Sequence, residues 1–177
     1  MNRPHPDCPT DCPGTAERGV DRHEPGTGER LNRLRAAVLG ANDGIVSTAA
    51  VVVGVAGATS DQTTIAMSGL AAVIGGAVSM ALGEYVSVSS QRDSERAMGL
   101  AEEMQVNPWS AAIASFLSFL LGAALPFATA LLAPASWRIA AIFVLTLVAL
   151  ALTGALSAKL GEAPVARSVA RIVVGGT

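Results

Sequence analysis

The stretch AAVLGANDGIVSTAAVVVGVAGA, residues 36–58, contains one ionisable side chain, Asp43. It is long enough to cross a bilayer, because about 20 apolar residues in a helix span a ~30 Å hydrocarbon layer. Three further stretches are equally apolar, and none of them holds more than one ionisable residue. We place the four spans near residues 36–58, 63–88, 109–133 and 139–158. The sequence therefore predicts an all-α, polytopic membrane protein with four full transmembrane helices.

The composition of the 177-residue chain agrees with this fold class. It is 51% hydrophobic and only 15% charged, with a net charge of −2. These values exclude a disordered chain and a nucleic-acid binder that depends on positive charge, and two cysteines do not make a disulfide scaffold. An enzyme is not expected either, because both histidines lie before residue 24 and no nucleophile–base pair stands out in the spans. No cofactor is expected.

The two ends of the chain differ from the spans. Residues 1–29 are rich in Pro, Gly and charged residues, and they predict a disordered tail ahead of a transmembrane domain over residues 30–177. Cys8 and Cys12 in this tail are interpreted as reduced thiols, because a flexible tail loses much conformational entropy when it binds a metal. A fifth helix is predicted from Pro164 to Thr177, too short to cross the bilayer. We expect either a truncated span or an interfacial helix there.

Basic residues predict the orientation. Eight of the nine that follow the tail flank the same ends of the predicted spans, and Arg138 alone lies at the opposite ends. The positive-inside rule then places the N-terminus, the 89–108 loop and the 159–167 loop in the cytoplasm. Eleven arginines against one lysine suggest a GC-rich, bacterial coding sequence. The predicted location is therefore a bacterial cytoplasmic membrane.

Two acids inside the spans support the functional prediction. A carboxylate at membrane depth costs at least ~2.5 kcal/mol, so such residues are usually functional. Asp43 lies eight residues after Arg35, and Glu84 lies eight residues before Arg92. We expect both acids at the same depth, roughly 12 Å inside the basic ends. The alternative is that the acids lie near the interface and pair with Arg35 and Arg92.

Further candidate ligands surround these acids. Met80 lies one turn from Glu84, Ser47 lies one turn from Asp43, and Asn42 adjoins Asp43. Carboxylates with a thioether favour first-row ions such as Fe²⁺ or Mn²⁺ over Ca²⁺ and Mg²⁺. Because protons compete with metals for carboxylates, metal–proton antiport is the predicted mechanism. For Met80 the alternative is ordinary packing.

The 89–108 loop holds a weaker candidate, a cytoplasmic patch of metal ligands. Three of its members share one helical face at spacings of three and four residues. A solvated amphipathic linker is the favoured alternative. The patch consists of Glu95, Met98, Glu102 and Glu103.

Small residues recur every fourth position on the first two spans. Such stripes allow helices to approach closely in a membrane, and they predict a homodimer through one of these faces. The first stripe is Gly40, Gly44 and Thr48, and the second is Gly75, Ser79, Gly83 and Ser87.

Several motifs resemble the vacuolar iron transporter family. They are GANDG at 40–44, MALGEYVSVSSQRD at 80–93, NPWSAAIASFLSFLLGAALP at 107–126 and GEAPVARSVARIVVGG at 161–176. The chain is most similar to the nodulin-like branch, which lacks a cytoplasmic metal-binding domain, because only about 20 residues separate spans two and three.

The resemblance implies a homodimer of five-helix protomers that moves Fe²⁺, and often Mn²⁺, out of the cytosol in exchange for protons. By motif, the family's pathway aspartate falls on Asp43 and its methionine on Met80, and Glu84 is expected to coordinate metal or carry protons. Metal ions, protons and the lipid bilayer are thus the expected partners. The alternative is a non-transporting membrane scaffold or an inactive truncated homologue, because the fifth helix is short.

Overall fold

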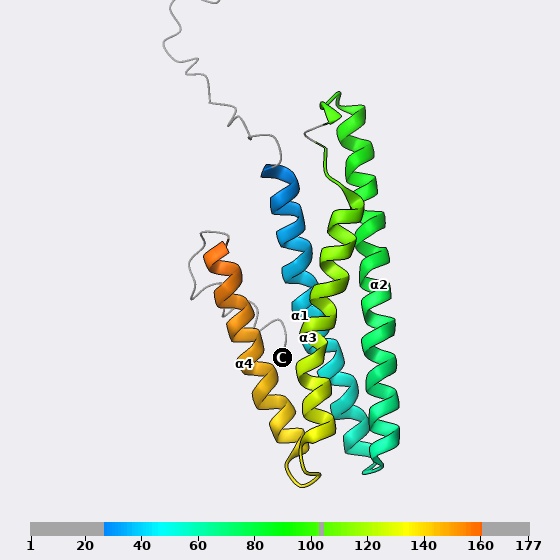
Figure 1. The fold of residues 1–177 in the computed structure, drawn as a ribbon, viewed down its shortest axis with the longest axis vertical. Helices are drawn as coiled ribbons and strands as arrows, with labels where there is room; N and C mark the ends of the chain where they lie inside the picture. Colours follow the sequence, from blue (N-terminus) through cyan, green and yellow to red (C-terminus); the bar gives the residue numbers. More distant parts are fainter. Residues whose placement is uncertain (1–26, 103–104, 161–177) are drawn as a thin grey trace, which may run out of the picture.

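The computed structural model describes residues 27–102 and 105–160. Within these ranges it contains four helices and no strands: α1 Thr27–Ala58, α2 Gln62–Ala97, α3 Pro108–Leu132 and α4 Arg138–Leu160. The helices run alternately up and down along one long axis (Figure 1). Each has an apolar window long enough to cross a membrane. The predicted all-α class and its four spans are confirmed.

Two helices extend beyond their predicted spans. α1 begins at Thr27, so the last residues of the predicted tail and the predicted domain boundary at residue 30 lie inside a helix. α2 continues to Ala97, through much of the predicted 89–108 loop. Hydropathy detects only the part of a helix that matches the hydrocarbon layer, whereas these two helices continue into charged sequence. The predicted fifth helix at 164–177 and the tail up to residue 26 lie outside the described residues.

Polar residues at the helix ends explain where α2 and α3 begin. The Asp61 carboxylate accepts hydrogen bonds from the Thr64 backbone N–H at 2.7 Å and the Thr64 hydroxyl at 2.6 Å. The Asn107 side chain accepts one from the Trp109 N–H at 3.0 Å. Both residues satisfy N–H groups that a helix start leaves free. Gly99, with φ 77°, turns the chain after α2, in a conformation that favours glycine.

α1 and α3 form the most extensive helix pair, and glycines bring their backbones together. A Cβ placed on Gly40 would lie 2.5 Å from the Ser115 carbonyl oxygen, and one on Gly44 would overlap the Phe119 carbonyl. Gly122 of α3 faces the α1 backbone in the same way. The glycines of the α1 stripe are therefore used for packing within the chain.

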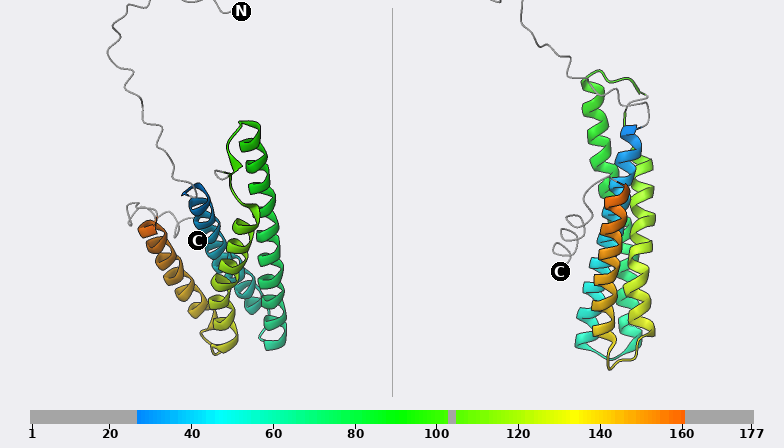
Figure 2. Two further views of the ribbon diagram at one scale, coloured as in Figure 1. Left: turned by 45° about the horizontal axis from the view of Figure 1, so that its top comes forward. Right: turned by 90° about the vertical axis from the view of Figure 1, so that its left-hand side faces the viewer.

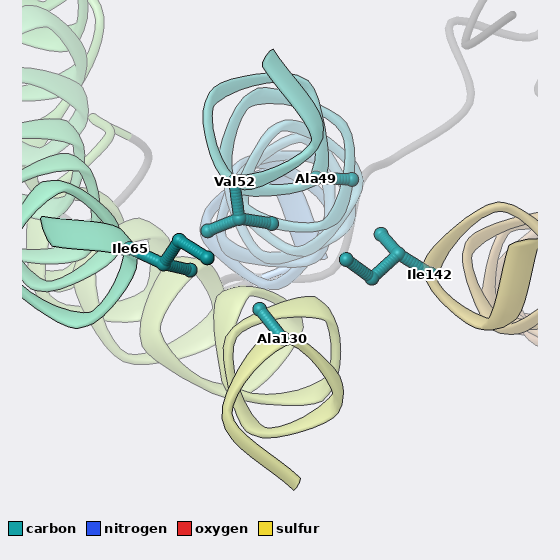
Figure 3. Close-up of a cluster of buried hydrophobic side chains, with 5 residues drawn as sticks. All are labelled: Ala49, Val52, Ile65, Ala130 and Ile142. Carbon is teal, nitrogen blue, oxygen red and sulfur yellow. The ribbon is translucent and has the colours of Figure 1, made fainter. Parts of the chain in front are cut away.

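Near the α1–α2 and α3–α4 turns, all four helices share one apolar cluster. Its buried members are Ala49, Val52, Ile65, Ala130 and Ile142, and Figure 3 shows the side chains pointing toward one another from the four helices. Burial of branched aliphatic side chains fixes the helix order at this end of the bundle.

Arg138 closes the same end of the bundle. Its guanidinium is buried and donates to the Gln62 Oε1 at 2.5 Å and to the Ala133 carbonyl at 3.3 Å. The Gln62 amide donates in turn to the Leu131 carbonyl at 3.0 Å. These bonds link the starts of α2 and α4 to the end of α3. Away from them α4 diverges from the other helices (Figure 1 and the left view of Figure 2).

Candidate metal-transport site

A groove with a cavity volume of about 490 Å³ runs along α1 and α2. Asp43 and Ser47 line it from α1, and Met80 and Glu84 line it from α2. Small residues of α2 keep it open, since they place no bulk between these four side chains; they are Gly76, Ser79 and Gly83. The structure therefore brings four predicted site residues, from two separate spans, into one groove.

Phe119 of α3 lies beneath this groove. Its side chain is fully buried, and a Cβ on either Gly44 or Gly76 would overlap Phe119. Met80 is partly buried and packs against the cluster that contains Phe119. Met80 thus lines the groove and also takes part in the ordinary packing that was its alternative, and its role as a ligand stays a prediction. Sequence reasoning missed Phe119, because a phenylalanine in an apolar span carries no distinguishing signal.

The two acids do not lie at the same depth. Ala36 and Val88 share one cluster, and a Cβ on Gly69 would lie 3.0 Å from Val52. In antiparallel helices these pairs place Asp43 level with about residues 78–81 of α2. Glu84 is three to six residues further along α2, and therefore roughly 5–9 Å nearer the end that carries Arg35 and Arg92. The prediction of equal depth is wrong, because the eight-residue spacings place the acids level only if α1 and α2 end together, whereas α2 projects beyond α1 at that end (Figure 1).

Glu84 forms an ion pair with Arg35. The Arg35 Nη2 donates to the Glu84 Oε1 at 2.5 Å, and the Glu84 side chain is only 5% exposed against 52% for Arg35. The alternative of pairing with an arginine therefore holds for Glu84, with Arg35 and not Arg92 as the partner. Arg92 instead lies 3.9 Å from Glu102. Within residues 27–102 and 105–160, Asp43 has no ion pair.

The two supporting ligands face different surroundings. The Ser47 hydroxyl donates to the Asp43 carbonyl at 2.6 Å, and Ser47 lines the groove. Asn42 does not line the groove, because adjacent residues of a helix point about 100° apart. Its Oδ1 is buried and has no partner in the part of the chain that the structure describes.

The loop patch is not assembled as a metal site in the described segments. Glu95 accepts from the Val106 N–H at 3.0 Å and from the Gln91 amide at 2.9 Å, so its carboxylate holds the α2–α3 turn. Met98 is exposed and Glu102 faces Arg92. Glu103 lies outside the described residues. Across those residues, no three His, Cys, Asp or Glu side chains are grouped to hold a metal.

The α2 stripe has a different environment from the α1 stripe. A Cβ on Gly75 or Gly83 would meet nothing within 4 Å, and Ser79 and Ser87 are exposed. This stripe follows the edge of the groove. In the described structure, the second small-residue face is therefore free of intramolecular packing at its glycines.

Aromatic residues mark both ends of the bundle. The tilted rings of Tyr85 and Trp109 contact each other, with centroids 4.8 Å apart, near the end that carries Arg35 and Arg92, and exposed Trp137 lies at the opposite end. Tryptophan and tyrosine concentrate at membrane–water interfaces. Four membrane-length helices and a groove with two carboxylates and a thioether thus define a polytopic membrane protein with a candidate ion path.

The chain belongs to the VIT family, whose model matches residues 34–105 and 97–177. It is 46% identical over 156 residues to the vacuolar iron transporter homolog 5 of Oryza sativa subsp. japonica, covering 83% of this chain and 75% of that protein. It is also 46% identical over 156 residues to the vacuolar iron transporter homolog 1 of Arabidopsis thaliana, covering 84% and 78%. No solved structure matches the chain. The resemblance to this family is confirmed.

These relatives contradict the predicted location. They are plant proteins named for the vacuole, and a bacterial cytoplasmic membrane finds no support among them. The prediction is wrong because it relied on the excess of arginine over lysine. That bias reflects the coding sequence and carries no physical information about the membrane that surrounds the helices.

Proposed function

We propose that this protein transports divalent iron across a membrane through the α1–α2 groove, with Asp43, Met80 and Glu84 as ligands. One observation supports the proposal above all: side chains able to bind metal, from two spans, line a single groove between apolar helices. The names of the relatives support iron as the transported ion. Iron is the cargo, and no resident cofactor is invoked.

The chemistry of the groove suits transport. Carboxylate oxygens bind divalent first-row metals, and a thioether favours Fe²⁺ over Ca²⁺ or Mg²⁺. Few ligands at separate depths bind an ion without trapping it, as conduction requires. Mn²⁺ is the second expected substrate. Exchange of metal for protons is supported by the carboxylates, which hold either a metal or a proton. Export from the cytosol is the direction that the resemblance to the family implies.

The groove also supports a homodimer. Carboxylates that face lipid are costly, so a groove that contains Asp43 and Glu84 needs a polar or protein cover. The α2 stripe along its edge allows close approach of a second copy. Two protomers that meet over this stripe would bring two sets of ligands together and enclose the path.

The experiment is transport into liposomes that contain purified protein, an acidic interior and a trapped metal-sensitive dye. We expect Fe²⁺ and Mn²⁺ to accumulate, and Ca²⁺ not to. Asp43→Asn keeps the side-chain size, removes the charge and should reduce the flux to that of empty liposomes. Asp93→Asn is the matched control, because the Asp93 side chain is 78% exposed and lies outside the groove.

Three results would contradict parts of the proposal. Full flux in Asp43→Asn would remove the groove from the transport path. Metal uptake that is accompanied by no proton efflux from the liposomes would exclude proton exchange. Gly75→Leu should weaken dimerisation and flux together without loss of folding, because Gly75 has open space and does not line the groove. An unchanged oligomer in that variant would exclude the α2 stripe as the interface.

A further inference from the structure

Arg35 of α1 forms an ion pair with Glu84 of α2, the acid of the groove that lies nearer the end of the bundle. Arg35 and Glu84 are 49 residues apart in the chain, and their ion pair links α1 to α2. The Arg35 Nη2 also donates to the Oδ1 of Asn32 at 3.2 Å, and Asn32 is itself buried. Its own helix therefore positions the guanidinium toward Glu84.

The two partners differ in their access to water. Glu84 is 5% exposed and lies within α2, whereas the Arg35 side chain is 52% exposed near the arginine-bearing end. A long arginine side chain can swing to water or headgroups while its stem stays on apolar surface. Arg35 is therefore the partner that can leave, and Glu84 is the partner that stays.

Charge balance implies that Glu84 pairs either with Arg35 or with a bound metal, and not with both at once. Asp43 and Glu84 are the only charged residues that line the groove in the described structure, and two negative charges at this depth are costly when it is empty. Arg35 offsets one of them. A divalent ion offsets both, and Arg35 would then add an unbalanced positive charge beside the metal.

We propose that Arg35 is a tethered counter-cation that holds Glu84 until a divalent ion displaces it, and that it thereby determines which ions enter the groove. This inference rests on the proposed function of the same groove. A sodium or potassium ion carries the same charge as the guanidinium and lacks its directional hydrogen bonds, so it gains little by replacing Arg35. A divalent ion interacts twice as strongly with each carboxylate. Arg35 therefore excludes monovalent ions and raises the metal concentration needed for half-maximal transport.

Arg35→Gln is the test, with Arg33→Gln as the matched control. Arg33 is exposed, lies on the same helix and has no ion pair among the described residues, so both variants remove one charge from the same region. We expect Arg35→Gln to lower the KM for Mn²⁺ transport about tenfold, as expected for loss of a charged competitor. Excess Na⁺ should inhibit Arg35→Gln and leave both the parent protein and Arg33→Gln unaffected.

Binding of Mn²⁺ to purified protein, measured by electron paramagnetic resonance, separates this inference from the proposed function. Tighter binding in Arg35→Gln than in Arg33→Gln supports the counter-cation even if the parent protein transports nothing. Transport by the parent with unchanged KM, binding and Na⁺ response in Arg35→Gln overturns the counter-cation and leaves the function standing. Equal changes in both variants also overturn it, because surface charge alone would then explain them.

Arg35→Lys keeps the test decisive if Arg35→Gln does not fold. Lysine retains the charge and loses the planar fork that arginine presents to a carboxylate. We expect a smaller fall in KM than in Arg35→Gln, with Na⁺ still excluded. An unchanged KM in correctly folded Arg35→Lys would overturn the inference in that case.

Discussion

Gly44→Ala tests the close approach of α1 and α3, on which the position of Asp43 depends. The added Cβ would lie 3.0 Å from the Phe119 carbonyl carbon and 3.1 Å from the Ala123 nitrogen, and closer still to the Phe119 carbonyl oxygen. Ordinary contacts begin at 3.4 Å, and the neighbouring atoms are backbone, so the helices must separate. Overpacking of this kind costs about 1–3 kcal/mol.

Gly54→Ala is the control on the same helix. A Cβ there meets nothing within 4 Å, so this variant measures only the gain in helix propensity from glycine to alanine. The difference between the two variants then isolates the overpacking cost. It corresponds to a Tm difference of about 2–12 °C for a chain of this size.

The assay is thermal unfolding in detergent, followed by circular dichroism and by the fluorescence of the two tryptophans. We expect Gly44→Ala to unfold at lower temperature than Gly54→Ala, and its metal flux to fall because Asp43 moves with α1. Equal Tm values for the two variants would refute the backbone contact between α1 and α3.

Two further predictions concern the end of the bundle that holds the α1–α2 and α3–α4 turns. Hydrogen bonds from the Thr64 hydroxyl and then from its backbone N–H lower the pKa of Asp61. A lowered pKa in the folded state means that this stabilisation is present above about pH 4 and is lost as the pH falls further. Between pH 6 and 3, the Tm should fall less in Asp61→Asn than in the parent protein. An equal fall of Tm in both proteins would contradict a stabilising role of the Asp61 carboxylate at the start of α2. Arg138→Ala leaves the Gln62 Oε1 and the Ala133 carbonyl without their donor and should cost about 1–3 kcal/mol. An unchanged Tm in that variant would show that the Arg138 bonds do not hold the helix ends.

Much of the fold was predictable because charge is expensive in a membrane. The gaps between ionisable residues located all four spans. The full lengths of α1 and α2 were not predictable in this way. Their outer turns are charged and leave the hydrocarbon layer, where hydropathy no longer distinguishes a helix from a loop.

The site was predictable in its residues and not in its arrangement. Asp43 and Glu84 stand out because they are isolated acids in apolar spans, and Met80 follows from helical spacing. Their offset depends on how far α2 slides along α1, which is set by contacts such as Gly44 and Gly76 against Phe119. Those contacts depend on the rotation of three helices about their axes. The spacing of residues along the sequence does not specify these rotations, so it could not show which of the two small-residue stripes, that of α1 or that of α2, packs against another helix of the chain.

The projection of α2 beyond α1 has a practical consequence for topology mapping. Gln105 accepts a hydrogen bond from the Arg96 Nε at 3.2 Å and donates to the Leu100 carbonyl at 3.0 Å, so the two sides of the α2–α3 turn are tied together. Chain ends held close together on an exposed turn tolerate inserted sequence. An epitope or protease site placed after exposed Gly99 would then report which side of the membrane the arginines occupy, without disturbing the groove.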